Sequence, residues 1–241
     1  MSAAQSRDER LAVLAHELRT PLATLVNAAE WLERTAVREP SIRSISEIVA
    51  RQTVVLQTLV EQLLDERRLD TDNVQLRMCE VDLRTVVSHA VEDHLPEMER
   101  AGLRCELAMD SQPIVVRGDA VKLGQVLANL LSNAIKFTPS AGLVQVAVRR
   151  SGAVASIRVR DTGVGMAPEL LPVIFDRYRQ ADRGSFGGLG LGLPIAKGLV
   201  ELHGGEMSAS SDGPGTGCTL EIRLPPAHSA TAESHDRASE P

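Results

Sequence analysis

Hydrophobic and polar residues alternate at helical spacing through the first part of the chain. Leucines recur three, four or seven residues apart from Leu11 to Leu32, which is the period of a seam buried between packed helices. A second apolar stripe runs from Ile42 to Leu63 after a break at Pro40. The pattern predicts a helical hairpin over residues 7–69. Because two helices bury such stripes poorly, we expect the hairpin to form a four-helix bundle with a second copy rather than to pack on its own chain.

The pattern changes after the polar stretch at residues 70–73. Residues 70–82 are expected to form a linker, with Asp82 capping a new helix. Helices are then expected at 83–101, 119–136 and 192–203, and extended segments at 103–109, 114–117, 143–148, 154–159, 206–210 and 218–224. This mixture predicts an α+β chain in which residues 83–224 form an α/β sandwich with helices on one sheet face. Residues 225–241 lack periodicity and are expected to be disordered.

Composition narrows the class of protein. The 241 residues, 43% of them hydrophobic, allow one or two domains with a sizeable core. No apolar run approaches the ~20 residues of a membrane span and no signal peptide is visible, so a cytoplasmic location without a membrane span is expected. Cys79, Cys105 and Cys218 form no CxxC pair, which predicts neither disulfides nor a zinc site. Few aromatic residues and scattered arginines argue against nucleic-acid binding.

The stretch HELRTPLA at residues 16–23 places a histidine and a carboxylate on the first helix. His16 lies off the leucine seam, and the adjacent Glu17 can take a ring proton and favour the tautomer whose other nitrogen is a nucleophile. Thr20 follows one helical turn later on the same exposed face. The alternative is that these are ordinary surface residues of a helix. A zinc site of the HExxH type is disfavoured because position 20 is threonine.

The predicted helix at 119–136 carries a polar row that suits a phosphate-bearing ligand. Asn129, Asn133 and Lys136 are spaced by four and three residues and therefore share one helix face. Amide oxygens are hard ligands that suit Mg²⁺, and a nearby lysine can meet phosphate charge. Taken alone, the two asparagines could merely be solvated on a helix surface.

Two glycine-rich segments complete the candidate site. In DTGVGM, Asp161 ends a strand and can accept from an exocyclic amine such as adenine N6, while Gly163 and Gly165 let a ligand approach the backbone. In GGLGLGLPIAKG, three alternating glycines precede a helix whose free amides form an anion site: Gly188, Gly190 and Gly192. Each segment alone could be a plain turn or a packing device. A Gly-Lys P-loop pair is absent, and residues 188–192 do not directly follow a strand as a dinucleotide fingerprint would.

Together these motifs resemble the transmitter region of sensor histidine kinases of two-component systems. HELRTPLA resembles the phospho-acceptor box, NLLSNAIKFTP the asparagine box, DTGVGM the first glycine box, IFDRYRQ the phenylalanine box and GGLGLGLPIAKGLVELHGG the second glycine box. The match spans roughly residues 7–224 in the family's order. The resemblance implies a dimeric phospho-acceptor hairpin joined to an ATP-binding domain of the type shared with gyrase, mismatch-repair and heat-shock chaperone ATPases.

The resemblance also implies a role for each matching position. His16 would accept the γ-phosphoryl group, Glu17 would act as the base, and Thr20 would orient water during dephosphorylation of a response regulator. Asn133, with Asn129, would hold Mg²⁺, and Asp161 would meet the adenine amine. The remaining nucleotide-site positions implied by the resemblance are Lys136, Phe137, Gly163, Gly165, Arg177, Arg179, Gly188, Gly190 and Gly192.

The implied activity is ATP-dependent autophosphorylation on histidine followed by transfer to a response-regulator aspartate, with phosphatase activity toward that regulator. The expected partners are a second copy of the chain, a response-regulator receiver domain, and either a separate sensory protein or a sensor domain from which this chain is excised. The alternative is a non-catalytic dimeric scaffold for phosphotransfer or ATP binding. The intact Asn133, Asp161 and glycine set argues against that alternative.

Overall fold

The computed structural model describes residues 74–179 and 189–225, residue 227, and nine positions between residues 23 and 60. The chain divides into two compact units, residues 1–74 with 172–195 and residues 75–171 with 196–241. The described positions in the predicted hairpin, which are 23–25, 27, 49, 52, 53, 56 and 60, are all helical. The pairing of the hairpin into a bundle and the predicted disorder of the tail lie outside the described residues.

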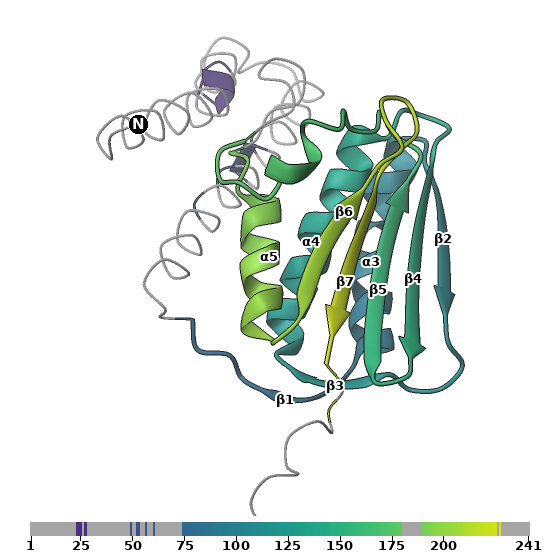
Figure 1. Cartoon of the computed structure of the whole chain (residues 1–241). Helices are drawn as coiled ribbons and strands as arrows, with labels where there is room; N and C mark the ends of the chain where they lie inside the picture. The colour runs from purple at the N-terminus through teal and green to yellow at the C-terminus, as the bar shows by residue number, and fades with distance from the viewer. Residues whose placement is uncertain are drawn as a thin grey trace, which may run out of the picture. The chain divides into compact units, whose positions relative to one another are not determined.

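The second unit contains a five-stranded mixed sheet (Figure 1). Its order is β2 (Arg104–Met109), β4 (Leu143–Ser151), β5 (Val154–Asp161), β7 (Thr219–Leu224) and β6 (Glu206–Ser210). Strands β2 and β4 pair in parallel, and the other neighbours are antiparallel. A hairpin turn joins β4 and β5, with Gly152 at φ +61° between paired Ser151 and Val154.

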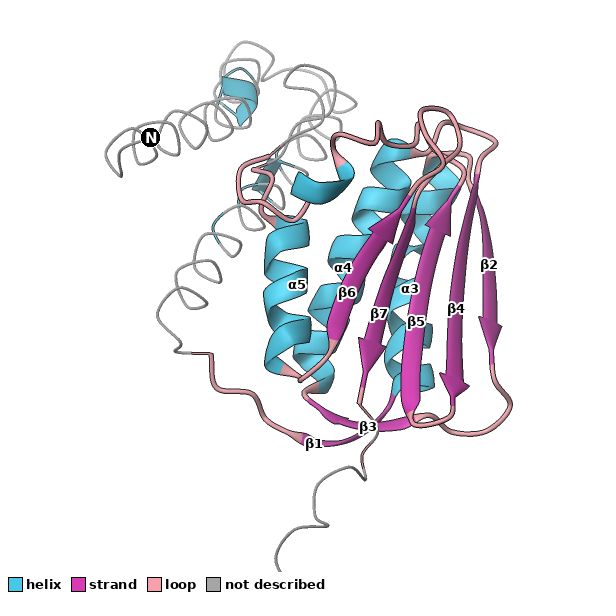
Figure 2. Cartoon of the chain, in the orientation of Figure 1, coloured by secondary structure: helices cyan, strands magenta, loops and turns pink. Residues whose placement is uncertain are grey.

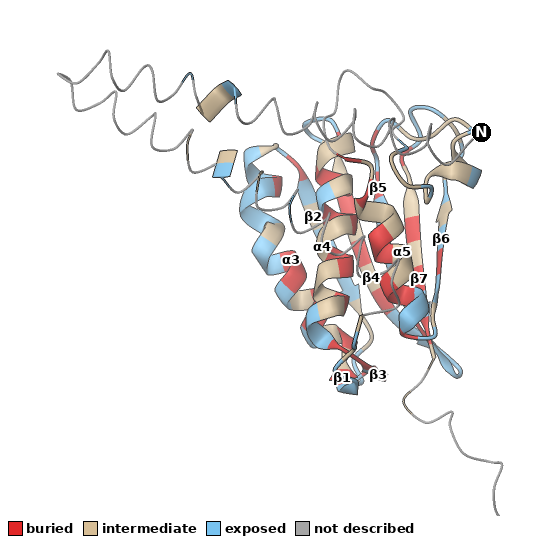
Figure 3. Cartoon of the chain, turned by 90° about the vertical axis from the view of Figure 1, so that its left-hand side faces the viewer, coloured by how far each residue is buried: buried red, intermediate tan, exposed pale blue. Residues whose placement is uncertain are grey.

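Three helices cover one face of this sheet (Figure 2). They are α3 (Leu83–Arg100), α4 (Ala120–Phe137) and α5 (Gly192–Leu202), and a short 3-10 turn, η1, spans Leu171–Val173. Apolar residues of α4 and of the sheet meet in the core, where Leu127, Leu130, Val146 and Ile157 are each no more than 1% exposed. Figure 3 shows buried residues along the helices where they face the sheet. The predicted sandwich with helices on one face is confirmed.

The opposite sheet face is polar. The Arg158 and Arg223 guanidinium groups each lie 3.1 Å from one oxygen of the Glu221 carboxylate, and Gln145 donates to Glu106 across β4 and β2 at 2.7 Å. The Arg158–Glu221 and Gln145–Glu106 pairs each join neighbouring strands, whereas Glu221 and Arg223 lie two residues apart on β7. All of these polar side chains share the solvated face of the sheet. The fold is therefore two layers thick. Within the described part of the chain, no helix has the length and apolar character needed to cross a bilayer.

A small second sheet was not predicted. Strand β1 (Cys79–Asp82) pairs antiparallel with β3 (Val115–Gly118), although the sequence analysis assigned its residues to a linker. Its four residues give too short a pattern, and its partner lies more than thirty residues away in sequence. Asp82 nevertheless caps α3 as predicted, since its Oδ1 accepts from the backbone of Arg84 at 3.1 Å and of Ile114 at 3.2 Å.

Asp119 joins three segments at the start of α4. It caps this helix: Oδ1 accepts from the backbone N–H of Val121 at 3.0 Å and of Lys122 at 3.1 Å. Its Oδ2 accepts from the Arg77 N–H at 2.9 Å, and its own N–H donates to His203 Nε2 at 3.0 Å. Burial raises the pKa of Asp119, but the three backbone donors and nearby His203 outweigh burial and hold the pKa below its ordinary value of 3.8.

We expect Asp119→Ala to lower the free energy of unfolding by about 1–2 kcal/mol, the usual cost of losing a helix cap. Because the folded-state pKa is depressed, this contribution is fully present above the ordinary pKa of 3.8 and is lost as the pH falls from there through the lower folded-state pKa. Denaturant titrations at several acidic pH values would measure both effects. Asp93→Ala, at an exposed position of α3, is the control. Equal stability of the two variants near neutral pH would contradict the capping role.

Candidate functional site

Asp161 ends β5 as predicted, with only 8% of its surface exposed. Its Oδ1 accepts two backbone hydrogen bonds, from Gly163 at 2.8 Å and from Cys218 at 3.2 Å. Its Oδ2 accepts none from the residues that the structure describes. One oxygen thus fixes the orientation of the carboxylate, and the other remains an acceptor for a ligand.

Two opposing effects set the protonation of this carboxylate. Burial raises the pKa of Asp161, the backbone donors lower it, and the net effect is a raised pKa. Because the Asp161 carboxylate is largely buried, a donor that reached Oδ2 would gain more than it would on the surface. This is the chemistry suited to an exocyclic amine of a nucleotide base.

The glycines after Asp161 serve close backbone packing. A Cβ on Gly163 would collide with the carbonyl oxygen of Phe137, and one on Gly165, which has φ +66°, would collide with that of Gly213. The Val164 N–H also donates to the Phe137 carbonyl at 3.0 Å. These glycines let the turn pack against the end of α4 and the β6–β7 loop, and their predicted role in ligand approach stays a prediction.

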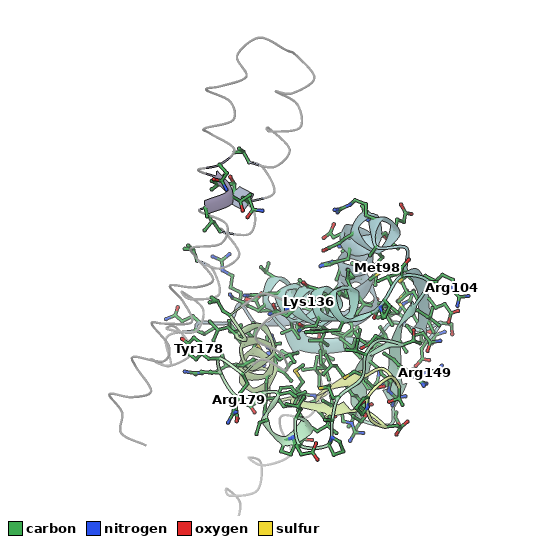
Figure 4. All side chains as sticks on the ribbon, turned by 90° about the horizontal axis from the view of Figure 1, so that it is seen from above. Met98, Arg104, Lys136, Arg149, Tyr178 and Arg179 are labelled. Atoms are coloured by element: carbon green, nitrogen blue, oxygen red, sulfur yellow. The ribbon has the colours of Figure 1, made fainter. Side chains whose placement is uncertain are left out.

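The two asparagines in the polar row of α4 keep their side chains available. Asn129 and Asn133 are half-buried, and neither amide makes a hydrogen bond with other described residues. Lys136, labelled in Figure 4, holds its Nζ 4.9 Å from the centre of the Phe137 ring. Asn129, Asn133 and Lys136 lie on α4, whose C-terminal end carries Phe137 and packs against the Asp161 turn.

The donor set fits a Mg²⁺ ion that arrives with a nucleotide. No group of three or more His, Cys, Asp or Glu side chains able to hold a metal occurs among the described residues. Two amide oxygens supply only part of an octahedral shell, but Mg²⁺ commonly keeps water and takes phosphate oxygens as its other ligands. Asn129 and Asn133 could therefore contribute to a metal site that the phosphates complete.

The remaining candidate residues belong to the first compact unit. Tyr178 adopts φ +61° and its N–H donates to the Gly190 carbonyl at 3.1 Å, while Gly190 itself has φ +65° and leaves no space for a Cβ beside the backbone of Arg179. This hydrogen bond links the residues just before the segment 180–188 to those just after it. Arg177 belongs to the residues before that segment, and Gly192, after it, is the first residue of α5.

Four predicted residues fall outside the described part of the chain: His16, Glu17, Thr20 and Gly188. Their roles stay predictions.

The β6–β7 loop was not predicted to take part in the site. Ser211 Oγ accepts from the Met166 N–H at 3.0 Å and donates to the Gly217 carbonyl at 2.7 Å, so this hydroxyl ties the loop to the turn after Asp161. Cys218, at the end of the same loop, donates its N–H to Asp161. The glycines at 213, 215 and 217 were the available signal, since each has a positive φ.

Comparisons with known protein families find two matching domains in this chain. Residues 6–72 match the family model of the His Kinase A (phospho-acceptor) domain, HisKA. Residues 118–228 match the model described as Histidine kinase-, DNA gyrase B-, and HSP90-like ATPase, HATPase_c. The first match includes His16, and the second includes Asp161 and the polar row of α4.

Individual relatives cover nearly all of this chain. Sensor histidine kinase RcsC of Escherichia coli (strain K12) is 34% identical over 228 residues, which is 92% of this chain and 24% of the relative. Sensor-like histidine kinase SenX3 of Mycobacterium tuberculosis (strain CDC 1551 / Oshkosh) is 34% identical over 223 residues, which is 91% of this chain and 54% of the length of SenX3. The structure of full-length ShkA in complex with AMPPNP matches with a TM-score of 0.69 and 29% identity, over 92% of this chain and 47% of that one. This chain thus spans about a quarter to a half of these proteins.

We expect Gly163→Ala to cost about 1–3 kcal/mol of stability, as overpacking does, because the added methyl group meets the Phe137 carbonyl and the Asp161 carboxylate. Gly124→Ala is the matched control: it lies within α4, has no atom within 4 Å of the added carbon, and should stabilise the helix by about 0.5–1 kcal/mol. Thermal unfolding of both variants would check this. Equal shifts would contradict the close packing of the turn.

Proposed function

The chain belongs to the histidine kinases of two-component systems through its two transmitter domains, and from this we propose that it binds ATP and phosphorylates His16. The phosphoryl group then passes to an aspartate of a response-regulator receiver domain. One observation carries this proposal. A buried carboxylate with one oxygen left open lies in an ATPase-type domain of the same chain that carries a phospho-acceptor domain.

We propose that Asp161 recognises the base of ATP. Its Oδ2 would accept a hydrogen bond from the adenine N6 amine, while the bonds to Oδ1 keep the carboxylate from turning. The AMPPNP complex of ShkA supports nucleotide binding by this type of domain. ATP is therefore the proposed cosubstrate.

The polar row of α4 would meet the phosphates. Asn129 and Asn133 would hold Mg²⁺ with the phosphate oxygens, and the ion would neutralise charge that develops during transfer. Lys136, together with Arg177 and Arg179, would add positive charge around the triphosphate. Phosphoryl transfer depends mainly on such positioning and neutralisation, so no covalent intermediate in this domain is needed.

In the phospho-acceptor domain, His16 would attack the γ-phosphorus through one ring nitrogen. Glu17 would accept the proton from the other nitrogen, which keeps electron density on the attacking one. The bond from the γ-phosphorus to the bridging oxygen breaks as the new bond to nitrogen forms, and ADP leaves. Thr20 would orient the water that hydrolyses the phosphorylated regulator, so the same helix face would serve kinase and phosphatase reactions.

The proposed assembly is a homodimer through residues 7–69, because the two apolar stripes of a single hairpin are better buried in a four-helix bundle. The response-regulator receiver would be the transient partner. A separate sensory protein or a sensor domain would supply the stimulus.

We expect His16→Gln to abolish incorporation of acid-labile phosphate from γ-labelled ATP without changing ATP affinity, because Asp161 and the amide row belong to the other matched domain. A filter assay measures the label, and titration calorimetry measures the binding. His89→Gln, at an exposed position of α3, is the control and should keep the label. Undiminished acid-labile label in the His16 variant would contradict the assignment of the phospho-acceptor.

A further inference from the structure

The chain enters the second unit through residues 75–78, which lead into β1 and are called the tether below. Backbone pairing between β1 and β3 begins at Cys79, opposite Gly118. After Gly118 the chain turns into α4, so the small sheet ends there. The tether is nevertheless held, because Asp119 Oδ2 accepts a hydrogen bond from the Arg77 N–H at 2.9 Å. A carboxylate thus continues the attachment of the chain at the point where strand pairing ends.

His203, the residue that follows α5, fixes the Asp119 backbone. The Asp119 N–H donates to His203 Nε2 at 3.0 Å, so that nitrogen is the acceptor and the ring proton lies on Nδ1. Nδ1 donates in turn to the Leu199 carbonyl at 2.7 Å. The ring also packs on β3, since a Cβ on Gly118 would lie 3.0 Å from His203 Cδ2. Asp119 and His203 are only 7% and 4% exposed, so the hydrogen bond between them is shielded from water.

We propose that Asp119 and His203 form a clamp on the tether, which positions the second unit for phosphoryl transfer to His16. This inference rests on the proposed function, because it takes His16 as the phospho-acceptor. Without the bond to Arg77, the first attached residue would be Cys79, and the two freed residues would add about 7 Å of reach. Transfer requires the reacting atoms to come within about 3–3.5 Å of each other. Slack of that size would therefore make fewer encounters productive.

The clamp is distant from the residues proposed to bind ATP. Helix α4 has 18 residues, which span about 27 Å at 1.5 Å per residue. Asp119 caps its first turn, whereas the Phe137 carbonyl at its other end accepts from Val164 in the turn after Asp161. Figure 1 shows β1 and β3 at the end of the sheet where α5 ends. Loss of the clamp should therefore slow transfer and leave ATP affinity unchanged.

Two substitutions remove the clamp and keep the cap of α4. Asp119→Ser retains one side-chain oxygen, which can still cap the helix, but has no second oxygen for the Arg77 N–H. His203→Leu removes the acceptor of the Asp119 N–H and so frees this part of the backbone. His203→Gln is the matched control, because its side-chain oxygen can still accept that bond. The Leu199 carbonyl keeps a partner in both His203 variants, since the backbone N–H of residue 203 also donates to it at 3.2 Å.

The first experiment measures whether the clamp holds the tether. Trypsin cleaves after arginine, so mass spectrometry would follow the fragment that begins at Met78. Its release should be roughly fivefold faster in Asp119→Ser and His203→Leu than in the unmodified chain, because cleavage follows the population of the open form. His203→Gln should keep the slower rate. Cleavage after Arg100, at the end of α3 and outside the clamp, should not change.

Two results of this experiment would overturn the inference. One is an equal rate of cleavage after Arg77 in all four proteins. The other is an equal acceleration after Arg77 and after Arg100, because it would show a general loss of stability rather than release of the tether. Neither result depends on kinase activity.

The second experiment measures phosphoryl transfer at saturating Mg-ATP. Asp119→Ser and His203→Leu should incorporate acid-labile label about tenfold more slowly than the unmodified chain, as expected for misplaced reactants, whereas His203→Gln should stay near the unmodified rate. Titration calorimetry should give the same ATP affinity for all four proteins. A clamp that served only the stability of the fold would not produce this separation of rate from affinity.

The outcomes of the second experiment distinguish the inference from the proposed function. An unchanged rate of labelling in clamp variants whose tether is cleaved faster would overturn the inference and leave the proposed function intact. A lower ATP affinity in those variants would also overturn it, since the damage would then extend beyond the tether. Absence of label in the unmodified chain would instead overturn the proposed function.

Discussion

The buried carboxylate of Asp161 depends on two backbone donors that come from different parts of the chain. One is the turn that follows its own strand, and the other is the residue that leads into β7. Without these bonds, burial alone would favour the protonated acid and leave its orientation undetermined. With them, a single oxygen is presented in a defined direction. The turn after Asp161 must pack closely for these bonds to form, which leaves no room for a side chain at Gly163.

The same turn links Asp161, the proposed base-recognition residue, to α4. The Phe137 carbonyl accepts from the Val164 N–H, and Gly163 can pack against the same carbonyl because glycine has no Cβ. A shift of the turn would therefore move Asp161 relative to the helix that carries Asn133 and Lys136. The proposed contacts to the base and to the phosphates are in this way held in register by main-chain bonds, which suits a reaction that depends on positioning.

The sequence predicted those features that local pattern determines. Helix α4 follows from its apolar periodicity and the Asp82 cap of α3 from a local hydrogen bond, and Asp161 was placed correctly at a strand end. Strand β1 was missed because its stability comes from a partner distant in sequence. The hydrogen bond from Cys218 to Asp161 was not predicted, since it arises from strand register, which a single sequence does not display.

Base discrimination by Asp161 tests the account most directly. Titration calorimetry would compare Mg-ATP and Mg-GTP on the unmodified chain and on Asp161→Asn, whose side-chain oxygen can still accept both backbone bonds. We predict that the unmodified chain binds ATP in preference to GTP, because guanine presents an oxygen acceptor where adenine presents an amine donor. The variant should lose most of that preference while remaining folded. Equal preference in the two proteins would contradict the assignment of Asp161 as the residue that recognises the base.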